Sequence, residues 1–214
     1  MSRRSSSTRR QFLQTAAATL FVGGSSVHAI SEITEGGKPP QSFAEVVKRR
    51  AMVRSYKSDP VPDEKIQQLL KYAVRAPSAG NVQPWEFIVV KDPTVRAQLT
   101  KAAGGQTSVA TAPVTIVTCA DIQRMGQQYG ARGSFFSLVD VSFASLLILL
   151  GAVEQGLGAC FVGSYNPEDV AKLLELPAHA RPVGIITIGH PAERPQKPKR
   201  SKIPLSKLVH REKW

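Results

Sequence analysis

The side chains best suited to chemistry in this sequence are arginines and small polar residues, because acid–base and metal-binding arrangements are missing. The four histidines are scattered, and Cys119 and Cys160 stand alone in apolar runs without the spacing of metal ligands. The sequence contains no phosphate loop, no dinucleotide-binding glycine string and no nucleophile elbow. Hydrolase and metalloenzyme interpretations are therefore weak. Cationic side chains and backbone amides instead suit an anionic cofactor.

Basic residues gather in two segments that could bind phosphate. The first reads Lys48-Arg49-Arg50-Ala51-Met52-Val53-Arg54-Ser55-Tyr56. The second follows the string Gly189-His190-Pro191 and reads Lys197-Pro198-Lys199-Arg200-Ser201-Lys202-Ile203-Pro204. A solvated basic helix end is the alternative for the first segment, because arginine is favoured there anyway. A solvated basic tail is the alternative for the second.

Two other segments combine glycine with small polar residues. One is the loop Pro77-Ser78-Ala79-Gly80-Asn81-Val82-Gln83-Pro84-Trp85, and the other is the strand end Ala159-Cys160-Phe161-Val162-Gly163-Ser164-Tyr165. Serine and asparagine side chains can donate hydrogen bonds to ligand oxygens, and glycine lets backbone approach a ligand closely. The alternatives are a plain turn for the loop and a bend for the strand end.

Together the four segments resemble the nitroreductase family, and they cover nearly everything from Phe43 to Leu208. The loop is the most specific match, because it is similar to the family string Pro-Ser-x-x-Asn-x-Gln-Pro-Trp. The resemblance implies an α+β fold with a central mixed sheet surrounded by helices and a long buried central helix. It also implies a homodimer that binds FMN at the subunit interface.

The first basic segment carries two of the implied contacts to FMN. By position, Arg50 would bind the phosphate, and Arg54 would reach the flavin ring near N1 and O2, where a cation stabilises the reduced form. Ala51 and Met52 stand where the family has a second arginine and a serine, so those polar contacts are lost or replaced by backbone. In the basic tail, Arg200 is the best match to the phosphate-binding cations.

The loop is implied to serve the partner subunit's flavin. Its contacts would fall on Pro77, Ser78, Ala79 and Asn81, with Ser78 and Asn81 donating to ribityl and phosphate oxygens. Gln83 would support the loop.

Four further positions complete the implied site. Backbone amides at Gly163 and Ser164 would lie over the flavin, with one hydrogen bond to N5. Gln106 is the substitute for an asparagine or lysine with which relatives touch the flavin, and Lys202 is a second phosphate ligand in the tail. Asp140 matches a family aspartate, and we expect it to act through electrostatics at the start of the central helix.

The implied reaction is a ping-pong cycle in which a donor such as NAD(P)H passes hydride to flavin N5 and an acceptor then takes the electrons. Family acceptors are small molecules such as nitroaromatics, quinones and free flavins. A dehalogenase-like or flavin-fragmenting enzyme on the same fold is one alternative. A basic, non-catalytic binding protein is another, but exposed aromatics interleaved with basic residues are not evident, so no nucleic-acid partner is expected.

The first 29 residues resemble a twin-arginine signal peptide. Arg9-Arg10-Gln11-Phe12-Leu13 follows Ser7-Thr8 and precedes an apolar stretch too short to span a bilayer. A disordered basic tail is the alternative. We therefore expect a signal peptide over 1–29, a linker over 30–41 and one FMN-binding domain over 42–214. The protein would be exported to the periplasm or beyond by the twin-arginine machinery, without stable membrane insertion.

The rest of the chain alternates between helical and strand patterns. The predicted helices cover 42–50, 63–75, 93–103, 138–155 and 166–176, and the predicted strands cover 85–92, 113–120, 159–165 and 182–191. Helix 138–155 is almost wholly apolar, which indicates a buried central helix. The net charge of +12 fits a soluble surface with a phosphate pocket. Cys119 and Cys160 are expected to be buried thiols, although an oxidising compartment would also permit a disulfide.

Overall fold

The structure is a computed structural model that describes residues 42–193 and 202–214. The predicted signal peptide (1–29), the predicted linker (30–41) and Arg200 lie outside the described residues. These three therefore stay predictions.

Four strands form the sheet of the described chain: β1 (Trp85–Val90), β2 (Val114–Asp121), β3 (Gly158–Val162) and β4 (Ala180–Gly189). Their order is β1-β2-β4-β3, so β1 and β3 are the two edges. All three ladders are antiparallel, and the mixed sheet that we expected is therefore wrong. Alternating helices and strands favour parallel crossovers, but β2 and β3, which run in the same direction, are separated in the sheet by the antiparallel β4. Parallel pairing among the described residues is limited to an isolated bridge, Met52–Ala159.

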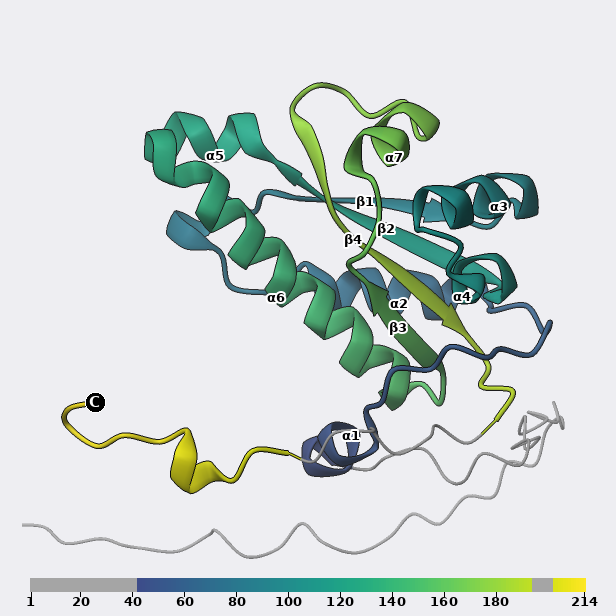
Figure 1. The fold of residues 1–214 in the computed structure, drawn as a ribbon, viewed down its shortest axis with the longest axis horizontal. Helices are drawn as coiled ribbons and strands as arrows, with labels where there is room; N and C mark the ends of the chain where they lie inside the picture. The colour runs from purple at the N-terminus through teal and green to yellow at the C-terminus, as the bar shows by residue number, and fades with distance from the viewer. Residues whose placement is uncertain (1–41, 194–201) are drawn as a thin grey trace, which may run out of the picture. The chain divides into compact units, whose positions relative to one another are not determined.

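Seven α-helices lie in the described part of the chain. They are α1 (Phe43–Arg49), α2 (Asp63–Ala73), α3 (Pro93–Ala102), α4 (Thr107–Thr111), α5 (Ile122–Tyr129), α6 (Gly133–Glu154) and α7 (Pro167–Leu173). Figure 1 shows α6 as the long helix that runs across the sheet. The observed arrangement confirms the α+β class and the long central helix.

Side chains on the two faces of the sheet belong to separate apolar clusters. Leu69 of α2 and Ile148 of α6 pack with Ile116 and Ile186 on one face. Leu99 of α3, Val109 of α4 and Val170 of α7 pack with Val117 and Ile185 on the other. The alternation of neighbouring strand residues between the clusters follows from the two-residue period of a strand. Fully burying one such side chain stabilises a fold by roughly 1.5–3 kcal/mol, so both layers anchor the sheet.

Local capping signals place several helix starts correctly. The Ser42 side chain accepts a hydrogen bond from the Glu45 amide, and Asn166 accepts from the first turn of α7. Helix α6 differs, because it begins at Gly133, five residues before the predicted start at Leu138. Helices α4 and α5 were not predicted, because they span only five and eight residues.

The segment Ile122–Glu154 is apolar and long enough to cross a membrane by length and composition, but half of its most apolar window is buried in the fold. A buried core helix meets the same criteria. Cys119 and Cys160 are both free and buried, so the disulfide that the sequence left open is not formed. Burial raises the pKa of the Cys119 thiol to about 12.

Candidate functional site

The arginine segment lies along the edge strand β3. After α1 ends, the Val53 amide donates to the Ala159 carbonyl at 3.0 Å, and Met52 forms the parallel bridge to Ala159. Val53 is buried, whereas Met52 and Arg54 on either side of it are exposed. This alternation is that of an extended chain, and it directs the Arg54 side chain away from the core.

Tyr56 fixes the far end of the arginine segment to β4. Its hydroxyl lies 2.7 Å from Thr187 Oγ1 and donates to the Val53 carbonyl. The backbone continues the attachment, because the Lys57 amide donates to the His190 carbonyl at 2.8 Å. Tyr56 is buried, and this burial raises its pKa well above the ordinary value. The segment that carries Arg54 is therefore held at both ends.

Arg50 and Arg54 are available to an anion. Arg50 is half-buried and Arg54 is exposed, and neither forms an ion pair with any residue in 42–193 or 202–214. Burial raises the pKa of the Cys160 thiol, and the Arg54 cation opposes part of this rise. Two uncompensated guanidinium groups beside one strand suit phosphate and an electron-rich ring.

The other end of β3 brings Gln106 to Gly163 and Ser164. The Gln106 side-chain amide donates to the Ser164 carbonyl at 3.4 Å, so these two predicted residues meet in space. Gly163 and Ser164 are exposed. A Cβ at Gly163 would lie 3.4 Å from the Phe161 ring, which is an ordinary contact. Packing within the chain therefore does not require glycine here, whereas close approach of a ligand would.

The loop before β1 has a defined but unusual backbone. Ser78 Oγ accepts from the Gln83 amide at 3.0 Å, and the Gln83 side chain donates to the Asn81 carbonyl at 3.3 Å. The latter contact fits the supporting role expected of Gln83, which stays a prediction. Gly80, Asn81 and Gln83 all have left-handed backbone, with φ of 55°, 56° and 55°. Left-handed backbone is uncommon in residues other than glycine.

The loop and the arginine segment join the sheet at opposite edges and opposite ends. Trp85 pairs with Ala120, which pairs with Arg181, whereas Ala159 pairs with Ile188. Three strand spacings of ~4.8 Å and seven residues of ~3.3 Å place the two points roughly 27 Å apart. One chain thus gathers Arg50, Arg54, Gln106, Gly163 and Ser164 along β3, but leaves Pro77, Ser78, Ala79, Asn81 and Gln83 elsewhere.

Two predicted residues contribute less than expected to the geometry. Lys202 is exposed, and no ion pair of the described residues includes it. Asp140 lies inside α6 and not at its start, so the role in helix-start electrostatics is wrong. Its carboxylate accepts from the Ala79 amide at 3.1 Å instead.

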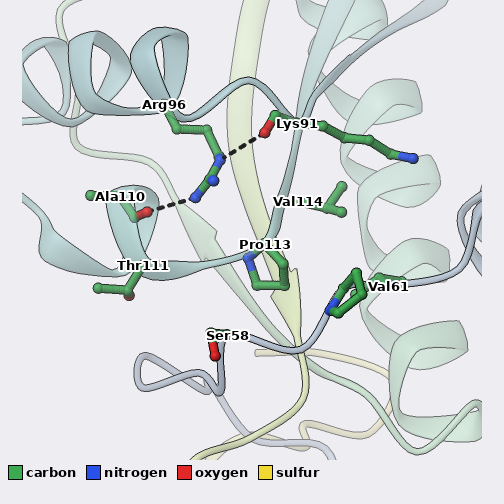
Figure 2. A pocket seen from close by; sticks show the side chains of 9 residues that line it. Ser58, Val61, Lys91, Arg96, Ala110, Thr111, Pro113 and Val114 are labelled. Atoms are coloured by element: carbon green, nitrogen blue, oxygen red, sulfur yellow. Dashed lines mark hydrogen bonds between the residues drawn. The ribbon is translucent and has the colours of Figure 1, made fainter.

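A cavity of about 400 Å³ lies next to the arginine segment, but the predicted site residues do not line it (Figure 2). Arg96 projects into it and donates to the carbonyls of Lys91 and Ala110. A further bond joins Arg96 to the Ala112 carbonyl, and Lys91 pairs with Asp63. Because backbone carbonyls occupy the Arg96 donors, its role here is to hold α4 against the turn that follows β1.

The chemistry available along β3 is binding and electrostatics. The described residues contain no cluster of histidine, cysteine or acidic side chains that could hold a metal ion. Free cations at one end and an open glycine-containing strand end at the other suit an elongated anionic ligand with a flat ring. Any redox chemistry would then come from the ligand.

Known proteins resemble this chain over most of its described length. The family model described as the nitroreductase family matches residues 47–111 and 100–190. An NADH dehydrogenase of Thermus thermophilus is 34% identical over 189 residues, covering 75% of this chain and 91% of the relative. An FMN reductase (NAD(P)H) of Bacillus subtilis is 31% identical over 176 residues, covering 76% of this chain and 70% of the relative.

A solved structure agrees with these sequence matches. The crystal structure of nitroreductase A from Vibrio parahaemolyticus superimposes with a TM-score of 0.73 at 26% identity, covering 80% of this chain and 76% of the other. The observed fold, the β3 site and the matches over 47–190 agree with one another. The chain therefore belongs to the nitroreductase family of oxidoreductases.

Proposed function

We propose that this protein is an FMN-dependent oxidoreductase that uses NAD(P)H to reduce a nitroaromatic, quinone or similar small acceptor by a ping-pong cycle. The observation that carries the proposal is the pair of free cations, Arg50 and Arg54, in the segment beside β3, the strand that ends in the open Gly163-Ser164 backbone. The names of the relatives, FMN reductase and NADH dehydrogenase, support the cofactor and the donor. Bound FMN would supply the hydride chemistry, and the protein would supply position and charge.

Each residue along β3 has a task in this proposal. Arg50 binds the FMN phosphate together with Lys202 and Arg200 of the basic tail. Arg54 lies near the electron-rich edge of the ring and favours additional negative charge there. The amides of Gly163 and Ser164 bind the ring, and Gln106 holds the Ser164 carbonyl so that this backbone keeps its direction.

The proposal includes a homodimer. Helix α6 exposes a row of large apolar side chains to solvent, namely Phe135, Leu138, Phe143 and Leu146, with exposed fractions of 62%, 50%, 44% and 46%. A row of this kind along one helix is typical of a protein–protein interface. A second copy on this face would bring its Ser78 and Asn81 to the flavin of the first, which one chain cannot do.

The proposal also includes export to the periplasm, or another exported location, by the twin-arginine machinery. The sequence Ser7-Thr8-Arg9-Arg10-Gln11-Phe12-Leu13 supports it. Because nicotinamide cofactors are not expected to be abundant outside the cytoplasm, we infer that an exported enzyme either has a different physiological donor or uses NAD(P)H only in vitro. Cell fractionation tests this, and cytoplasmic retention of an Arg9→Lys/Arg10→Lys variant is the expected result. Equal distribution of the two forms would contradict export by this route.

The main test is the visible spectrum of the purified protein and identification of the chromophore released by heat. We expect stoichiometric FMN, and we expect Arg50→Ala and Arg54→Ala each to weaken FMN binding about tenfold or more. Lys48→Ala is the matched control, because this exposed cation lies in the same segment. A colourless protein that does not take up added FMN would overturn the proposal.

A further inference from the structure

Asp140 is an acidic residue in an otherwise apolar stretch of α6. Its side chain is 3% exposed, and its carboxylate accepts the Ala79 amide of the loop at 3.1 Å. Burial raises the pKa of this carboxyl, and the Ala79 hydrogen bond opposes the rise. A buried carboxyl costs stability unless it is hydrogen-bonded, and the helix itself needs no acid at this position. The hydrogen bond from the Ala79 amide therefore accounts for the acidic residue at position 140.

Arg124 of α5 holds the other end of the same loop. Its guanidinium donates to the Gln83 carbonyl at 2.7 Å. Two carboxylates fix this guanidinium in turn, because Asp121 lies 3.0 Å from it and Glu86 lies 3.1 Å from it. The start of the loop, at Ala79, is thus attached to α6, and the end of the loop, at Gln83, is attached to α5.

The backbone between the two attachments is strained. Asn81 and Gln83 adopt left-handed φ values of 56° and 55°, which L-residues disfavour. Gly80 has φ of 55°, and a Cβ there would collide with the Tyr129 hydroxyl of α5. Strained backbone of this kind persists only where the surrounding structure determines it, and it is typical of ligand-binding sites.

We infer that Asp140 and Arg124 are positioning residues that hold the loop 78–83 so that it presents Ser78 and Asn81 to the FMN of the partner subunit. This inference rests on the proposed function. Asp140 lies on α6, the helix whose exposed row forms the proposed dimer face, so its bond to Ala79 ties the loop to the interface.

The first experiment measures FMN affinity for variants of Asp140. Asp140→Ala leaves the Ala79 amide without its partner, and we expect the FMN dissociation constant to rise about tenfold. Asp140→Asn keeps an acceptor oxygen and should restore most of the affinity. Ser145→Ala is the matched control, because Ser145 is a buried polar residue of α6 that bonds Thr118 and Val141 and lies away from the loop. This control should lower the melting temperature without changing FMN affinity.

Arg124→Ala keeps the inference testable if Asp140→Ala does not fold. The Arg124 side chain is 43% exposed, so its removal leaves the core intact, and FMN affinity should fall as for Asp140→Ala. Wild-type FMN affinity in folded Asp140→Ala or in Arg124→Ala would overturn the inference. Failure of the wild-type protein to bind FMN would instead overturn the proposed function.

Mixed dimers show whether the loop serves the partner. One chain carries Arg50→Ala and Arg54→Ala, which removes its own half of the site, and the other carries Asp140→Ala. Each site takes its arginines from one chain and its loop from the other. In the mixed dimer, one site therefore combines the missing arginines of the first chain with the altered loop of the second, and the other site has intact arginines and an intact loop. We expect about one tightly bound FMN per mixed dimer and weak binding in each parent dimer. Mixed dimers that bind no better than the parents would overturn the inference, because the loop would then act on its own chain's site.

Discussion

The Tyr56 hydroxyl lies 2.7 Å from the Thr187 hydroxyl in the interior of the protein. Tyr56 closes the segment that carries Arg50 and Arg54, and Thr187 lies near the C-terminal end of β4. Thr187 Oγ1 also lies 3.5 Å from the Cys160 carbonyl oxygen of β3. One hydroxyl pair therefore links the arginine segment to the two strands beside it, and the position of Arg54 depends on it.

Replacing Tyr56 with phenylalanine removes this link and keeps the ring. We expect a loss of about 1–2 kcal/mol in the free energy of unfolding, because the Thr187 hydroxyl and the Val53 carbonyl lose a buried partner. FMN affinity should fall as well, since Arg54 is then held less firmly. Urea unfolding and FMN titration measure the two effects. Tyr72→Phe, which removes an exposed hydroxyl of α2, is the control. Equal behaviour of the two variants would contradict the anchoring role.

Alanine substitutions at two glycines of the β3 region should affect different properties, namely stability at Gly158 and FMN binding at Gly163. A Cβ at Gly158 would lie 2.8 Å from the Val53 side chain, so Gly158→Ala should displace the arginine segment and lower stability by about 1–3 kcal/mol. A Cβ at Gly163 meets only an ordinary contact, so Gly163→Ala should leave stability nearly unchanged and weaken FMN binding. Thermal unfolding with and without FMN separates these effects. A large loss of stability in Gly163→Ala would show that its glycine is structural.

Removing the Arg54 cation should make bound FMN harder to reduce. In the proposed site Arg54 favours negative charge on the ring, so Arg54→Ala should lower the two-electron reduction potential by about 30 mV, which corresponds to ~1.4 kcal/mol. Arg54→Lys should lower it less, because the charge remains. Spectroelectrochemical titration at FMN saturation measures the potential. An unchanged potential would place Arg54 away from the ring.

A charge in the exposed row of α6 should separate the subunits. Leu138 is 50% exposed, and lysine there would bury a charge in the proposed interface. We expect Leu138→Lys to sediment as a monomer and to lose tight FMN binding, because the partner loop is lost. Val89→Lys on β1 is the control, since Val89 is a large apolar residue of similar exposure away from α6. Dimers of Leu138→Lys that retain FMN would contradict this interface.

Local signals explain which parts of the fold are predictable from the sequence. The caps Ser42 and Asn166 are confirmed, because a cap bonds amides only two or three residues away. The pairing direction of the strands was predicted wrongly. It depends on where each helical connection brings the chain back to the sheet, which local sequence does not encode. The role of Asp140 was missed because its partner, Ala79, is 61 positions away. A single acid in an apolar helix was the available signal, and it indicates a buried polar contact.

Contacts between residues far apart in the sequence also limit what can be predicted of the candidate site. Arg50, Arg54, Gly163 and Ser164 are predicted from sequence strings, and Gln106 is predicted from its place between the loop 77–85 and the strand end 159–165. These site assignments stay predictions. Arg124 could not be predicted, because an arginine at the start of a short helix looks like an ordinary surface cation. Its bond to the Gln83 carbonyl becomes evident only when β1 and α5 are placed side by side.

Alkaline pH should destabilise the protein through its buried Cys119 and half-buried Tyr165. Burial raises the pKa of Cys119 from 9.0 to about 12 and that of Tyr165 from 10.0 to about 12. Both folded-state values lie above the unfolded ones, so the stability linked to these groups is fully present below about pH 9. Between pH 9 and 12 the unfolded chain loses protons that the folded chain keeps, and stability falls.

Urea unfolding at a series of pH values tests this linkage. We expect the free energy of unfolding to decline from about pH 9 upward, with a slope that reflects more than one proton per molecule when both groups titrate. Cys119→Ala removes one of them, so its slope between pH 9 and 12 should be shallower whatever its stability at neutral pH. Ser108→Ala is the control, because it alters a buried polar residue that does not titrate in this range. Parallel slopes in the wild type and Cys119→Ala would mean that the Cys119 thiol reaches water in the folded protein, because only then would its pKa match that of the unfolded chain.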